Sequence, residues 1–201
     1  MKHYLLLFFF VLLSCKKENP ELNTASDNKM INLRYEVLND LLLNKDSQFA
    51  GPETCCIYQI SPEEAFFHTE NEEPDWPMGI NTVYSPDFPA EDSVFFKNEN
   101  KDLINFKLNK DKIGRSLFFV SQEELDQIKK PDADFWTEFS KKYPNKCIRR
   151  FSVPFFNKDR SKCIVRLSVS CGPLDGSGYM AVYQKINGRW KEVRILNEWI
   201  S

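Results

Sequence analysis

The sequence predicts an α+β fold, in which N-terminal helices precede a C-terminal antiparallel β-meander. Near the start of the domain, apolar residues recur at helical spacing, whereas over residues 163–171 they alternate with less apolar ones. The pair Asn187-Gly188, the strongest short hairpin signal, lies between two further strand-like segments. Strands and helices do not alternate along the chain, so no parallel sheet is expected.

The first element is a short leader. Lys2 precedes an apolar run over residues 4–13, which is too short for a membrane-spanning helix of about 20 residues. Residues 12–15, Leu-Leu-Ser-Cys, resemble the lipobox of bacterial lipoproteins. The resemblance implies that residues 1–14 are a signal peptide and that Cys15 becomes the lipidated first residue. The expected location is the cell envelope, at the outer membrane, on its periplasmic face or at the cell surface.

A tether and one domain are expected after the leader. Residues 15–28 are polar and contain Pro20, which predicts a flexible tether behind the lipidated cysteine. Residues 29–201 suffice for a single domain with a hydrophobic core. From residue 27 to about residue 43, the apolar spacing predicts an amphipathic helix capped by Asp27 or Asn28.

The middle of the chain is less regular. Residues 46–92 contain six prolines between short apolar pieces, which predicts loops and short strands. Three apolar segments then predict strands at residues 94–96, 103–108 and 116–120.

Two helices are expected next. Ser121 and Glu124 form a capping box, so a short helix should run toward Lys130 and end at Pro131. A second helix over residues 132–143 places four aromatic side chains on one side, and these are expected in the core: Phe135, Trp136, Phe139 and Tyr143.

The C-terminal residues predict the meander. Residues 148–156 are predicted to form a strand. Because Pro154 has no backbone N–H to donate to a neighbouring strand, this strand is expected at the edge of the sheet. A turn at residues 157–161 follows, and then a strand with one buried face over residues 163–171. The hairpin at Asn187-Gly188 completes the sheet.

Charge is unevenly distributed along a chain whose net charge is only -2. Residues 46–96 hold eleven acidic and no basic side chains, whereas residues 141–166 hold nine basic and one acidic. The basic segment could bind a polyanion, or it could pack near the acidic segment of the same chain, and we favour the second interpretation. The export signal argues against nucleic acid as a partner.

Five cysteines remain after Cys15, so they cannot all pair with one another. Cys163 and Cys171 lie too far apart along one strand to bridge. A disulfide, if present, is expected to join Cys55 or Cys56 to one of the three later cysteines, Cys147, Cys163 and Cys171. Alternatively, several are buried thiols.

A glycine-rich segment is the main candidate site. Its candidate residues are Cys171, Gly172, Asp175, Gly176, Ser177 and Gly178. Exposed N–H groups there could bind an anion, and Cys171 or Ser177 could act as a nucleophile. We favour a wide turn in which glycines adopt positive φ.

No metal or cofactor site is expected. His68 is the one histidine after the leader, so any catalytic dyad would need it, and it is expected at the surface. The acidic residues Glu70, Glu72, Glu73 and Asp75 match no calcium loop and are expected in a solvated loop.

The last third of the chain carries a resemblance. Phe135-Trp136, Tyr143-Pro144, the Cys171-to-Gly178 segment, Gly188-Arg189-Trp190 and terminal Trp199-Ile200-Ser201 resemble a group of uncharacterised secreted or lipid-anchored proteins of Bacteroidota type. Members of that group often carry a second cysteine at the position of Asp175. The hairpin after helices is also similar to the end of NTF2-like domains, which implies a curved sheet around a small-ligand pocket.

Three functions follow as hypotheses. The first is a non-catalytic envelope lipoprotein that recognises an envelope protein or glycan or captures a ligand, held to the membrane by its lipid. The second is an envelope hydrolase using Cys171 or Ser177 with His68. The third is an NTF2-like cup for a small ligand. We favour the first, and assign no catalytic residue.

Overall fold

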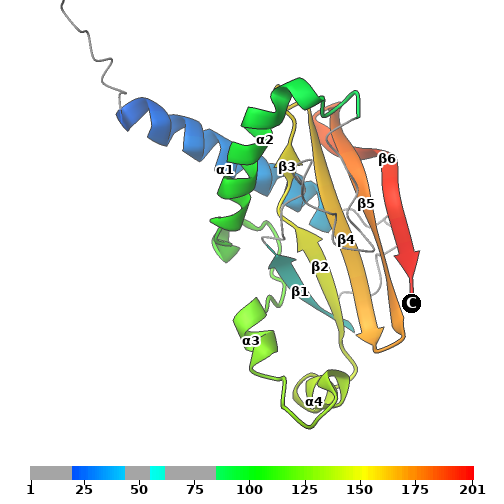
Figure 1. The fold of residues 1–201 in the computed structure, drawn as a ribbon. Helices are drawn as coiled ribbons and strands as arrows, with labels where there is room; N and C mark the ends of the chain where they lie inside the picture. The colour runs from blue at the N-terminus through cyan, green and yellow to red at the C-terminus, as the bar shows by residue number, and fades with distance from the viewer. Residues whose placement is uncertain (1–19, 44–54, 62–84) are drawn as a thin grey trace, which may run out of the picture.

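The computed structural model describes residues 20–43, 55–61 and 85–201, and Figure 1 shows their arrangement. Its helices are α1 Pro20–Leu43, α2 Ser93–Ile104, α3 Gln122–Asp126 and α4 Phe135–Lys142, with 3-10 turns at Ala90–Asp92 and Lys110–Lys112. Its strands are β1 Cys56–Ser61, β2 Cys147–Ser152, β3 Phe155–Phe156, β4 Lys162–Gly172, β5 Asp175–Ile186 and β6 Arg189–Ile200. The class is α+β, as the sequence predicts.

One mixed sheet organises the molecule. Its strand order is β1-β2-β4-β5-β6, with β3 paired to β4 beyond the end of β2. The meander β4-β5-β6 is antiparallel, but β1 pairs with β2 in parallel, so the expectation of no parallel pairing is wrong. The chain between β1 and β2 includes α2, α3 and α4, and a parallel pair needs a long connection of this kind.

Helices cover both faces of the sheet. On one face, which we call the α1 face, Val37 and Leu38 of α1 pack with Val165 and Ala181 of the meander. On the opposite face, α2 packs its Phe96 against the alternate residues of the strands, such as Ile164 and Val182. The helices α3 and α4 cover the same second face near β1 and β2, where Ile57, Phe139 and Ile148 are buried together.

Helix α1 is longer than predicted. It begins at Pro20 rather than at an Asp27 or Asn28 cap, so its first turns fall in the segment predicted to be a tether. Proline suits the first turn of a helix, where its missing N–H has no intrahelical partner. In Figure 1 these first turns extend beyond the sheet. None of the helices in the described ranges is long and apolar enough to cross a membrane.

Two strand predictions in the middle of the chain are wrong. Residues 94–96 belong to α2, and residues 103–108 hold the end of that helix and an irregular segment. Helical spacing brings Phe96, Glu99 and Leu103 to one buried face, which the local run of apolar residues did not reveal. Of residues 116–120, Phe119 forms a single parallel bridge to Tyr58.

The two short helices agree better with the sequence. Ser121 and Glu124 form the predicted capping box of α3, although the helix ends at Asp126 rather than near Lys130. The α4 helix is capped by Asp134, whose side chain accepts from the N–H of Thr137. Of the four aromatic residues predicted in the core, Phe139 is buried, and the other three are partly buried and pack against it: Phe135, Trp136 and Tyr143.

The predicted turns at residues 157–161 and 187–188 are confirmed, but one predicted strand is interrupted. Pro154 separates β2 from β3, and β2 lies between β1 and β4 rather than at the predicted edge. Asn187 and Gly188 have φ values of 52° and 77°, as a tight hairpin turn requires.

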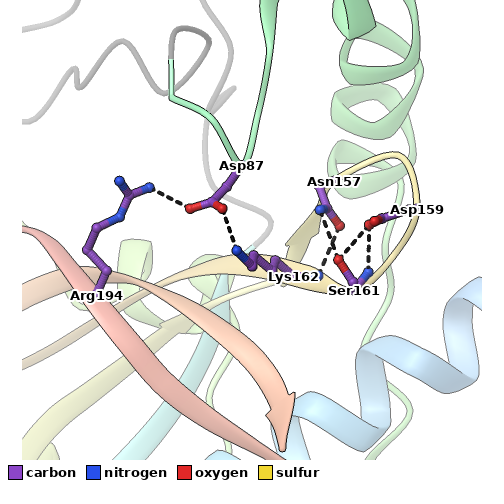
Figure 2. Close-up of polar contacts among 6 residues, drawn as sticks. All are labelled: Asp87, Asn157, Asp159, Ser161, Lys162 and Arg194. Carbon is purple, nitrogen blue, oxygen red and sulfur yellow. Dashed lines mark hydrogen bonds and ion pairs between the residues drawn. The ribbon is translucent and has the colours of Figure 1, made fainter.

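Complementary charges join the acidic and basic segments at the end of the sheet that holds the turns at 157–161 and 187–188, which we call the turn end. Figure 2 shows the Asp87 carboxylate accepting from Lys162 of β4 and Arg194 of β6. Beside them, Asn157, Asp159 and Ser161 bond one another within the turn. The expectation that basic strands pack near the chain's own acids therefore holds at this end.

Candidate functional site: the cysteine end of the sheet

Three cysteines meet at the opposite end of the sheet, which we call the cysteine end. Cys56 begins β1, Cys147 begins β2, and Cys171 lies near the end of β4. Cys147 and Cys171 form a disulfide with a Cα–Cα distance of 4.2 Å. The predicted pairing through Cys55 or Cys56 is therefore wrong, because the register of β2 against β4 brings Cys147 opposite Cys171.

The remaining cysteines are thiols in different surroundings. Cys56 is the parallel register partner of Cys147 and is only 7% exposed, whereas its neighbour Cys55 is exposed. Cys163 lies on the same strand as Cys171 and does not bridge to it, as predicted. Burial raises the pKa of the Cys163 thiol well above its usual range, and the Glu99 carboxylate adds to this effect.

The glycine-rich segment is not the wide turn that the sequence predicts. Residues 173 and 174 form a tight connection, and Asp175 already pairs with Gly172 across the two strands. Gly176 and Gly178 lie within β5, where a Cβ on Gly178 would come within 2.7 Å of the indole nitrogen of Trp199. These two glycines are needed for the close approach of Trp199 and not for positive φ.

The candidate nucleophiles are not arranged for catalysis in this state. The sulfur of Cys171 is bonded to Cys147, and Ser177 pairs within the sheet with Val169 and Ile200. His68, the acidic group from Glu70 to Asp75, and Cys15 lie outside the described residues.

A cleft opens beside the cysteine end, next to α4. Its volume is about 590 Å³, and its walls come from the start of β1, residues 116–118, residues 142–144 and Lys146. Phe118 is 58% exposed, and its ring meets the Tyr143 ring at a centroid distance of 5.9 Å. Ile57, Leu117 and Pro144 complete a largely apolar lining. A cleft of this size and character suits a small molecule.

Local sequence explains how α4 supplies this wall. The helix ends before Pro144, since a proline disfavours helical geometry in the residue that precedes it. Asn145 then takes a φ of 56°, and the N–H of Lys146 donates to the carbonyl of Tyr143. This turn reverses the chain into β2 and leaves the Tyr143 side chain at the cleft.

Cations border the apolar surface. The Lys142 ammonium lies 5.3 Å from the centre of the Tyr143 ring, and Lys146 also lines the cleft. The Arg149 guanidinium lies 5.9 Å from the centre of the Tyr58 ring. Burial raises the pKa of Tyr58, and Arg149 partly offsets that rise, so the phenol stays protonated near neutral pH. The site therefore combines aromatic surface with positive charge.

A second hollow of about 380 Å³ lies between α1 and the end of α2. Arg34, Asp102 and Lys107 line it together with apolar side chains, so both charge signs are present. Within the three described ranges, no group of three or more His, Cys, Asp or Glu residues could hold a metal ion.

Comparisons with known proteins add no function. No protein-family model matches the chain, and neither curated proteins nor solved structures give a match. Sequence reasoning missed the cleft because Phe118 and Tyr143 were assigned to a strand and to the core. Only the packing of α4 beside β1 brings these rings together.

Proposed function

We propose that this protein is a lipid-anchored binding domain of the bacterial cell envelope, and that its cleft takes an apolar ligand carrying an anionic group. The cleft is the observation that carries the proposal. Its apolar lining includes the exposed Phe118 ring, which a ligand would cover, and Lys142 and Lys146 stand at the same surface. An apolar body would gain from burial there, and an anionic group would be attracted by the Lys142 ammonium.

Export is supported by two independent features. The lipobox-like residues 12–15 imply a lipid anchor at Cys15. The Cys147–Cys171 disulfide suits an oxidising compartment outside the cytosol. With α1 beginning at Pro20, four residues separate Cys15 from the helix, so the first turns of α1 would hold the cleft away from the membrane.

The alternative functions gain less support. A hydrolase using Cys171 would first have to break the disulfide, and Ser177 lies within the paired part of β5. An NTF2-like cup would need open space beside the meander, but on its α1 face the side chains of α1 pack against Val165 and Ala181. The cleft beside α4 is the better ligand site.

Dye binding tests the ligand class. The chain without its leader, residues 16–201, keeps every described element and would be titrated with anilinonaphthalene sulfonate and with the uncharged N-phenyl-naphthylamine. Lys142→Glu should weaken sulfonate binding about tenfold, which corresponds to about 1.4 kcal/mol, and should change binding of the uncharged dye little. Phe118→Ala should weaken binding of both dyes, because it removes apolar surface.

Matched controls come from α2, away from the cleft. Lys97→Glu repeats the charge reversal at an exposed position, and Val94→Ala removes apolar surface from a side chain that is 72% exposed. Neither should change the binding of either dye. If Lys97→Glu lowers sulfonate affinity as much as Lys142→Glu does, net charge rather than the cleft governs binding, and the ligand proposal fails.

The anchor is tested separately by mass spectrometry of the native product. We expect residues 1–14 to be absent and Cys15 to carry a diacylglyceryl group on its sulfur. An unmodified thiol at Cys15 would remove the lipid anchor from the proposal and leave the cleft's binding chemistry standing.

A further inference from the structure

The cysteine end holds three cysteines on three neighbouring strands. Cys147 lies on the middle strand, with Cys56 as its register partner on β1 and Cys171 as its disulfide partner on β4. Neighbouring strands lie about 4.8 Å apart, and a disulfide tolerates Cα separations up to about 7 Å. Cys147 is therefore within bridging distance of both Cys56 and Cys171.

The side chains of Cys56 and Cys147 also share one face of the sheet. Register partners in a parallel pair point to the same face, and both residues belong to the core on the α1 face. By contrast, Cys56 and Cys171 are two strands apart, which is about 9.6 Å and beyond the reach of a disulfide. Any rearrangement must therefore pass through Cys147.

We propose that these residues form a thiol–disulfide exchange site, in which the disulfide of Cys147 moves between Cys171 and Cys56. The Cys56 thiolate attacks the sulfur of Cys147 and forms a new S–S bond. The Cys147–Cys171 bond breaks, and the sulfur of Cys171 leaves as a thiolate that takes up the proton lost by Cys56. One disulfide and one thiol are present before and after, so the step needs no external oxidant.

The strand order favours this displacement. Strands β1 and β4 lie on opposite sides of β2. The attacking sulfur of Cys56 therefore reaches the Cys147 sulfur from the side opposite to the one on which the Cys171 sulfur leaves. The exchange moves the thiol from the buried Cys56 to the exposed Cys171. The Cys171 thiolate could then attack a disulfide bond of an envelope partner, forming a mixed disulfide with one partner sulfur while the other partner sulfur leaves as a thiolate. In this way, the buried Cys56 thiol is exchanged for a reactive Cys171 thiol at the surface.

Disulfide mapping tests the exchange directly. The oxidised chain of residues 16–201 would be incubated at mildly alkaline pH, where more of a thiol is ionised, then quenched in acid, alkylated under denaturing conditions and digested. We expect two populations, one with the Cys147–Cys171 bond and alkylated Cys56, the other with a Cys56–Cys147 bond and alkylated Cys171. Cys56→Ser should reduce alkylation of Cys171 to background, whereas Cys55→Ser should leave it unchanged.

The Cys171→Ser variant gives a second test, which does not depend on the folding of Cys56→Ser. Cys171 is exposed, so Cys171→Ser should keep the native circular dichroism, and oxidised glutathione should then drive formation of a Cys56–Cys147 bond. Cys147→Ser should give no bond between Cys56 and Cys171. The inference is overturned if folded Cys171→Ser keeps both Cys56 and Cys147 as alkylatable thiols after oxidation.

Discussion

The charged side chains at the two ends of the sheet have different surroundings. At the turn end, Asp87 binds Lys162 and Arg194, Asp92 binds Lys158, and Asp40 accepts from Arg189 and from the backbone N–H of Trp190. At the cysteine end, the Lys142 ammonium lies over an aromatic ring beside an open cleft. The ion pairs of the turn end join separate elements, whereas the Lys142 ammonium lies beside the apolar cleft that we propose as a ligand site. The contrast supports our proposal of a ligand site at the cysteine end.

Thiol reactivity should give the largest contrast between the ends. Cys163 lies near the turn end, fully buried, with a raised pKa, whereas Cys55 at the cysteine end is exposed. Because the thiolate is the reactive form, alkylation of Cys163 in the native protein should be slower than that of Cys55 by about two orders of magnitude or more. Time-resolved alkylation and peptide mapping measure both rates. Comparable native rates would contradict the burial of Cys163.

Removing a buried charge near the turn end should have the largest effect on stability. The Arg34–Glu99 pair is 3% and 2% exposed, and Glu99 also accepts from the N–H of Phe156, just before the turn. Arg34→Met should lower the free energy of unfolding by about 3–5 kcal/mol, since it leaves a buried carboxylate without its cation. Urea unfolding measures the loss, and adding Glu99→Gln should restore part of it.

The pH dependence of that variant has a definite sign. Burial raises the pKa of Glu99, and Arg34 opposes the rise, so Arg34→Met should raise the pKa further. A carboxyl group with a folded pKa above its unfolded value contributes stability at low pH that is lost as pH rises through the folded pKa. The single variant should therefore regain stability on acidification from neutral pH toward the ordinary Glu pKa, relative to the Arg34→Met/Glu99→Gln protein. Parallel pH profiles would contradict this assignment.

Packing at the cysteine end should give an intermediate effect. A Cβ at Gly178 would lie 2.7 Å from Trp199 Nε1 and 2.8 Å from the Leu167 carbonyl oxygen, and the backbone atom cannot easily move aside. Gly178→Ala should cost about 1–3 kcal/mol in urea unfolding. Gly114→Ala is the matched control, because its Cβ would meet its nearest neighbour at an ordinary 3.7 Å. Equal losses in the two variants would show that Trp199 does not restrict Gly178.

Surface charges should give the smallest effects and the most direct comparison of the two ends. Asp87→Asn should lower stability by about 1 kcal/mol, since it weakens two partly exposed ion pairs, and the loss should shrink in high salt. Lys142→Gln at the cysteine end should change stability by less than about 0.5 kcal/mol. Unfolding at low and high salt measures both. A larger loss for Lys142→Gln would reverse the assignment of structural and binding charges.

Local sequence determined the features that need only near neighbours. The capping box at Ser121, the aromatic side of α4 and the hairpin at Asn187-Gly188 all follow from hydrogen bonds or backbone angles within a few residues. Alternation over residues 163–171 likewise predicted the strand β4, but the prediction of a single buried face is wrong, because Ile164 on the other face is covered as well.

Tertiary structure alone decided the features that depend on register between distant segments. The parallel pairing of Cys56 with Cys147 joins residues about ninety positions apart, and the disulfide partner of Cys147 follows from the alignment of β2 with β4. The role of Gly178 depends on Trp199, which only the β5–β6 pairing brings above it. Since no local pattern encodes which strands become neighbours, the cleft and the row of cysteines could be found only in the folded molecule.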